Sequence, residues 1–95
     1  MADVTSRLQQ RIERDLDRSL DAWSQLPRVE VEIDEWDQLD QIVFLEEWTL
    51  EEERLLRLER DAANGTFTPE QRQRYEQLQR LVAKNRPIIK RLRDS

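Results

Sequence analysis

Carboxylates are the side chains of this chain that could carry chemistry, because it has no cysteine and no histidine. The two absences exclude disulfides, thiol nucleophiles, thiolate zinc sites and imidazole acid–base catalysis. Glu47 with Glu51 and Asp37 with Asp40 have helical spacing, and glycosidases and metal centres use such pairs. These residues lie outside the apolar stripes, however, and a di-iron bundle needs an inward-facing Glu-x-x-His. No serine lies in a nucleophile elbow. The sequence therefore predicts no enzyme, no cofactor and no metal.

Charge is divided unevenly along the chain, although the net charge is only -5. Residues 29–53 contain eleven acidic and no basic residues, whereas residues 69–95 contain eight basic and three acidic ones. The basic end with Tyr75 could bind nucleic acid by stacking, but the acidic middle opposes this, so a nucleic-acid partner is not expected. The two regions could attract each other as solvated faces. Alternatively, the acidic middle binds a basic protein.

The elements that position these charges are mostly helices. Ala2–Leu26 reads as a long first helix, which Pro27 ends or closely follows. Its apolar stripe steps by four residues through Val4, Leu8, Ile12, Leu16 and Leu20. So narrow a stripe needs a packing partner, which could be the rest of the chain, a second copy or another protein.

Residues 28–33 alternate apolar and acidic side chains, which is a strand pattern: Val29, Glu30, Val31, Glu32 and Ile33. No second strand of equal quality exists, and a lone strand leaves its backbone groups unpaired. We therefore expect residues 27–36 to form an extended acidic connector that lies on the helices. The alternative is a strand that pairs with a second copy or with a partner's sheet edge.

A short helix is expected over residues 37–48, capped by Asp37. It places Leu39, Ile42, Val43 and Glu46 on one side. Trp36 and Trp48 bracket it and are expected in a core, or else at an interface.

Residues 49–95 predict an antiparallel helical hairpin. Thr49 with Glu52 and Thr68 with Gln71 have capping-box spacing, and Pro69 suits a first helical position. Gly65, the only glycine, is expected as a left-handed C-cap residue. The last helix carries a heptad stripe, namely Tyr75, Leu78, Val82, Asn85, Ile89 and Leu92. Pro87 predicts a kink or break near Asn85.

The C-terminal part, with T-P-E-Q, Tyr75, Leu78, Leu81-Val82 and N-R-P-I-I, resembles short, uncharacterised bacterial helical proteins. In size and charge the chain is similar to antitoxins, small acidic proteins that wrap a basic toxin. That resemblance implies a protein partner, although no helix-turn-helix or ribbon–helix–helix pattern is present for operator binding.

The sequence thus predicts a single all-α or nearly all-α domain that neutralises or regulates a basic protein. Its predicted binding residues are Val29, Val31, Ile33 and Trp36 as anchors, with Glu30, Glu32, Asp34 and Glu35 as steering carboxylates. The alternative function is a homo-oligomeric helical scaffold, such as a dimer, and a second alternative is a nucleic-acid binder that uses the basic C-terminal helix. No apolar run spans a bilayer and no signal-peptide core is seen, so a soluble cytoplasmic protein is expected.

Overall fold

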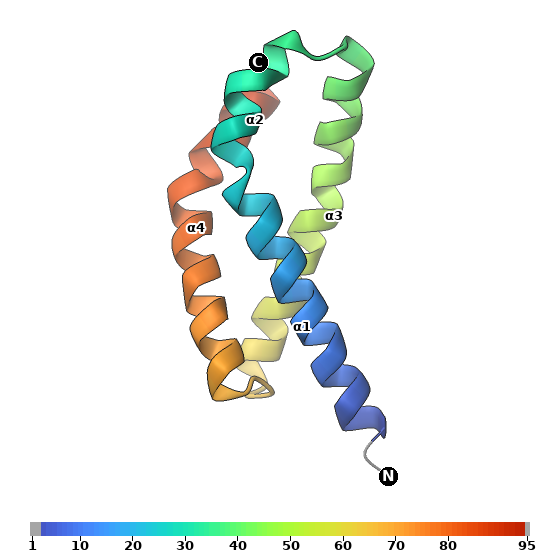
Figure 1. The fold of residues 1–95 in the computed structure, drawn as a ribbon, viewed down its shortest axis with the longest axis vertical. Coiled ribbons are helices and arrows are strands. Elements are labelled where there is room, and N and C mark those ends of the chain that lie inside the picture. The colour runs from blue at the N-terminus through green and yellow to red at the C-terminus, as the bar shows by residue number, and fades with distance from the viewer. Residues whose placement is uncertain (1–2, 95) are drawn as a thin grey trace.

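A computed structural model describes residues 3–94, and within them every regular element is helical. The elements are α1 (Asp3–Ser24), α2 (Leu26–Glu32), the 3-10 turn η1 (Ile33–Glu35), α3 (Gln38–Ala63) and α4 (Pro69–Asp94). α3 and α4 run antiparallel, α1 packs against both of them, and α2 packs against α4 (Figure 1). The all-α prediction is confirmed. Ala2 and Ser95, which the predicted helices included, lie outside the described residues.

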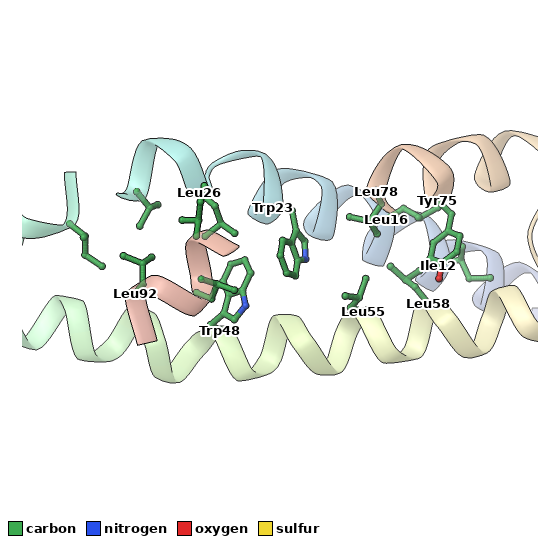
Figure 2. Packing of buried hydrophobic residues seen from close by; sticks show 14 residues of the cluster. Ile12, Leu16, Trp23, Leu26, Trp48, Leu55, Leu58, Tyr75, Leu78 and Leu92 are labelled. Carbon is green, nitrogen blue, oxygen red and sulfur yellow. The ribbon is translucent and has the colours of Figure 1, made fainter. Parts of the chain in front are cut away.

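The core is a single cluster of fourteen buried apolar side chains contributed by every element. Its centre is a pair of indole rings, Trp23 of α1 and Trp48 of α3, whose centroids lie 4.9 Å apart in an edge-to-face arrangement (Figure 2). The α1 stripe is buried at Ile12 and Leu16, whereas Val4 at the start of the helix is exposed. The core position predicted for Trp48 is thereby confirmed.

The hairpin turn begins with the C-cap predicted from Gly65. Gly65 has a φ of 68°, and the backbone N–H groups of Gly65 and Thr66 donate to the carbonyls of Ala62 and Asp61. This is the Schellman pattern, which satisfies carbonyls that the helix end leaves open. The turn therefore has the conformation that its only glycine favours.

The capping box predicted at the start of α4 is also confirmed. Thr68 N–H donates to Gln71 Oε1 at 2.9 Å, and Gln71 N–H donates to Thr68 Oγ1 at 3.1 Å. Pro69 is the first residue of the helix, where its missing N–H leaves no hydrogen bond unmade. These local contacts fix where α4 starts.

The extended connector and the lone strand predicted over residues 27–36 are wrong, because residues 26–35 are helical. A helix satisfies the backbone hydrogen bonds locally, which a lone strand cannot do. It also puts Val29 and Ile33, four residues apart, on one buried face, while Val31 turns to solvent. The five-residue alternation was compatible with either structure.

The boundary predicted at Thr49 is also wrong, because α3 is continuous from Gln38 to Ala63 and Thr49 is an exposed mid-helix residue. No glycine or proline stands between Asp37 and Ala63 to end a helix there, so the Thr-x-x-Glu spacing falls inside one. Asp37 occupies the predicted N-cap position, but its side chain makes no capping hydrogen bond.

α4 continues as a helix through Pro87, so the break that was one of the two predicted outcomes does not occur. A proline leaves the carbonyl four residues earlier without its donor, and here both Pro87 and Ala83 are exposed, so that water can reach this carbonyl. The stripe on this helix is largely confirmed, since Tyr75, Leu78, Ile89 and Leu92 are buried.

Pro27, near the start of α2, explains why the polar residue Asn85 stands in the apolar stripe of α4. Pro27 has no N–H to donate to the carbonyl of Trp23, four residues earlier in a fully buried position. Asn85 of α4, itself buried, donates its Nδ2–H to this carbonyl at 2.8 Å. A side chain from α4 thus satisfies the backbone at the junction of α1 and α2.

Candidate partner-binding face

The apolar anchors predicted over residues 29–36 do not share one surface. Val29 and Ile33 are core residues, 8% and 6% exposed, so they are not available to a partner in this fold. Trp36 is half-buried, and its ring lies 5.8 Å from that of Phe44. Only Val31, which is 79% exposed, faces solvent.

The carboxylates predicted beside them divide into two groups. Glu30 accepts hydrogen bonds from Arg91 at 2.7 and 3.0 Å, which lowers the pKa of the Glu30 carboxyl, and Glu32 pairs with Arg28 at 3.3 Å. Asp34 and Glu35 are exposed, and neither has an ion-pair partner among residues 3–94. Glu30 links α2 to α4, and Glu32 forms its ion pair within α2. Asp34 and Glu35 are therefore the two predicted carboxylates that remain available to another molecule.

An apolar surface lies instead on the first half of α3. Leu39 is 64% exposed, Ile42 47%, Val43 40% and Leu50 60%. The buried side of the same helix carries Trp48 and Leu55, which points this row of four toward solvent. The sequence did place Leu39, Ile42 and Val43 on one side of a helix, but it could not indicate that this side lacks a partner element.

Carboxylates without a basic partner surround this row. Seven exposed side chains within residues 34–53 make no ion pair with any described residue: Asp34, Glu35, Asp37, Asp40, Glu46, Glu47 and Glu53. Together with Leu39, Ile42, Val43 and Leu50 they form what we call the acidic face. Exposed apolar side chains grouped among charges mark interaction surfaces on small proteins.

Two grooves flank α3 along this face. One, of about 320 Å³, lies toward α1 and α2, and its lining includes Ala22, Phe44, Glu47, Trp48 and Leu50. The other, of about 400 Å³, lies toward α2 and the end of α4, and its lining includes residues 33, 41, 42, 45 and 91. A docked chain could therefore place side chains on both sides of the apolar row.

Beneath the first groove lies a buried carboxylate. Glu51 Oε2 accepts hydrogen bonds from Ser19 Oγ at 2.8 Å and Trp23 Nε1 at 3.0 Å, and Glu51 also pairs with Arg54. Burial raises the pKa of the Glu51 carboxyl, against the opposing effects of these donors. Every Glu51 contact joins α1 to α3 or stays within α3, so its position indicates a structural role.

A similar network ties α1 to the second half of α3. Arg11 donates to Asp15 at 3.0 Å and to Asp61 at 2.9 Å, and Arg57 also donates to Asp15. Arg86 of α4 pairs with Glu52 and stands 5.1 Å from the centre of the Trp23 ring. These three arginines therefore form their ion pairs with carboxylates of the bundle itself.

Few other chemical features emerge from the described residues. Within residues 3–94, no group of three or more carboxylates is arranged to hold a metal ion, and no helix has both the length and the apolar character to cross a membrane. Comparisons with protein-family models, with curated proteins and with solved structures found no significant match to this chain. The geometry of the acidic face is thus the main guide to function.

Proposed function

We propose that this protein is a small interaction module that binds a basic protein through its acidic face and thereby neutralises or regulates it, as antitoxins do. The observation that carries the proposal is the exposed apolar row on α3 together with the seven unpaired carboxylates around it. The residues that we first predicted as anchors are replaced in this role by the row on α3, while the predicted carboxylates Asp34 and Glu35 remain part of the acidic face.

The two components of the face have different effects on binding. Unpaired carboxylates of one sign create a field that speeds encounter with a basic surface, and this effect weakens as salt screens it. Apolar side chains supply the free energy that holds the complex once it has formed. We therefore expect association with a basic partner to be fast and salt-dependent, with a remainder that salt does not abolish.

A homo-oligomeric scaffold is the second candidate, and the same apolar row favours it. α4 carries five exposed cations without an ion pair among the described residues, namely Arg72, Arg80, Lys84, Lys90 and Arg93. Contact between these cations and the acidic face of another copy would run head to tail. Light scattering distinguishes the candidates, because this arrangement gives assemblies whose mass falls as salt is added, without any second protein.

Purification from the native host at low salt tests the first candidate, provided that two charge variants are run beside the wild type. The test variant neutralises part of the acidic face with Asp34→Asn, Glu35→Gln and Asp40→Asn. The control makes the same change in net charge elsewhere, with Glu59→Gln, Glu76→Gln and Asp94→Asn, none of which makes an ion pair among the described residues.

We expect one stoichiometric basic protein to accompany the wild type and the control, to leave on raising the salt, and to be depleted from the test variant. Equal recovery with both variants would show that the acidic face is not the binding surface. Recovery of RNA or DNA in place of a protein would instead favour the cations of α4.

A further inference from the structure

The solvent side of α3 has the spacing of a helix–helix interface. Leu39, Val43, Glu46, Leu50 and Glu53 follow one another at steps of four, three, four and three residues, and all five are exposed. These are the a and d steps of a heptad, which line up along one side of a helix for about four turns. We call this row the α3 seam.

The seam differs from an ordinary solvated helix surface in composition. Leu39 and Leu50 are 64% and 60% exposed, and Val43 is 40% exposed, which is unusual for seam positions unless another helix covers them. A strand would not match this row, because its side chains repeat every two residues and a three-four step does not. Knobs-into-holes packing by a second helix does match it.

The two carboxylates of the seam, Glu46 and Glu53, decide which kind of helix can pack on it. If the seam met the seam of a second copy in parallel, Glu46 and Glu53 would face the same carboxylates of the partner, and like charges repel. In antiparallel orientation each glutamate would instead be buried against an apolar seam residue with no cation beside it, which is also unfavourable. A helix with Lys or Arg opposite Glu46 and Glu53 meets no such repulsion. The other five unpaired carboxylates of the acidic face extend this preference for cations beyond the seam itself.

We propose that the α3 seam binds an amphipathic helix of the partner, which places apolar side chains over Leu39, Val43 and Leu50 and Lys or Arg side chains opposite Glu46 and Glu53. This inference rests on the proposed function and specifies the partner's structure at the contact. The grooves beside α3 receive the flanking side chains of that helix, including an apolar one beside Phe44 and Trp48. The seam excludes a second copy of itself.

Three synthetic peptides of equal length test the proposal with the full chain. The basic peptide is an amphipathic helix with a Leu row and Lys at the two positions that face the carboxylates. The acidic peptide has Glu at those two positions. The shuffled peptide has the composition of the basic one but no apolar row. Binding is measured by isothermal titration calorimetry at low and at moderate salt.

We expect the basic peptide to bind at least about tenfold more tightly than the shuffled peptide, which lacks the apolar contacts, and the acidic peptide not to bind. Leu50→Ser should weaken the basic peptide by about tenfold, while Leu56→Ser, an exposed leucine of the same helix outside the seam, should change its affinity less than about twofold. The double variant Glu46→Lys with Glu53→Lys should prefer the acidic peptide. Circular dichroism confirms that each variant keeps its helix content.

Equal effects of Leu50→Ser and Leu56→Ser, or equal affinity for the basic and shuffled peptides, would overturn the seam while leaving the acidic face as a charge-based binding surface. If no basic peptide bound and no basic protein were recovered from the host, the proposed function itself would fail. A dimer of the wild type that Leu50→Ser dissociates would also overturn the proposal, since a second copy would then occupy the seam.

Discussion

Replacing Asn85 with leucine offers a direct test of how the bundle is held together. The change removes the donor for the Trp23 carbonyl, which Pro27 cannot supply, and places an apolar side chain in an apolar stripe. Simple hydrophobic reasoning predicts that the variant gains stability. The hydrogen-bonding pattern predicts that it loses stability, so the sign of the effect distinguishes the two explanations.

The expected size follows from opposing contributions. A buried carbonyl left without a partner costs about 1–3 kcal/mol. The leucine returns up to about 1.5 kcal/mol of apolar burial and a few tenths of a kcal/mol in helix propensity, but its larger side chain overpacks this buried site at a cost of about 1 kcal/mol or more. We therefore expect Asn85→Leu to lower the free energy of unfolding by about 1 kcal/mol, measured by urea denaturation with tryptophan fluorescence, which reports on the buried Trp23.

Restoring the missing backbone donor should rescue this variant. Gln25 keeps right-handed helical dihedral angles, φ -85° and ψ -12°, so an alanine at position 27 could donate its N–H to the Trp23 carbonyl. Pro27→Ala should therefore be more favourable in the Asn85→Leu background than in the wild type, by about 1 kcal/mol of coupling. Pro87→Ala is the matched control, because the carbonyl that Pro87 leaves open is exposed to solvent. Additive effects of Asn85→Leu and Pro27→Ala would refute the reasoning.

Three further variants probe the buried carboxylate Glu51 and the turn at Gly65. Glu51→Ala leaves the buried donors of Ser19 and Trp23 unpaired and should lower the free energy of unfolding in urea by about 2–4 kcal/mol. The exposed control Glu53→Ala should lower it by less than about 0.5 kcal/mol. Similar losses in the two variants would contradict the structural role of Glu51. Because burial raises the folded-state pKa of Glu51, its contribution to stability should be greatest below about pH 4 and decline as the pH rises through that pKa; Glu51→Gln should lack this decline, and parallel pH profiles would argue against it. Gly65→Ala should lower the free energy of unfolding by about 1–2 kcal/mol, because the φ of 68° is unfavourable for a residue with a Cβ atom. No atom lies near the added methyl group, so a steric clash adds nothing to this cost. A neutral result in thermal or urea unfolding would mean that the turn relaxes.

The sequence was sufficient where the determinants of structure are local. The turn between α3 and α4 was predicted from Gly65, Pro69 and the Thr68–Gln71 pair, and each adopts the role that its own chemistry favours. Such signals act within a few residues and do not depend on what packs nearby. The apolar stripe of α4 was found for the same reason, since its heptad spacing is visible in the sequence.

Prediction failed where tertiary contacts decide between structures that are locally compatible. The alternation of Val29, Val31 and Ile33 fits a strand, but packing of Val29 and Ile33 against the core selects the helix. The seam on α3 was missed because the predicted boundary at Thr49 put Leu39 and Val43 in one helix and Leu50 in the next, whereas α3 is continuous. Exposure of Val43 and Leu50 depends on the absence of a neighbouring helix, which spacing alone cannot show.

The distribution of ion pairs separates the binding face from the part of the bundle that carries stability. Arginines of α1, α3 and α4 pair with carboxylates elsewhere in the bundle, as Arg11 does with Asp15 and Asp61 and Arg86 does with Glu52. None of these pairs uses a residue of the α3 seam. Leu50 and Glu46 can therefore be changed without removing a core contact or an ion pair within the described residues, and a loss of binding in such variants reports on the surface itself. The same separation means that a partner's cations have no internal arginine to displace when they reach Glu46 and Glu53.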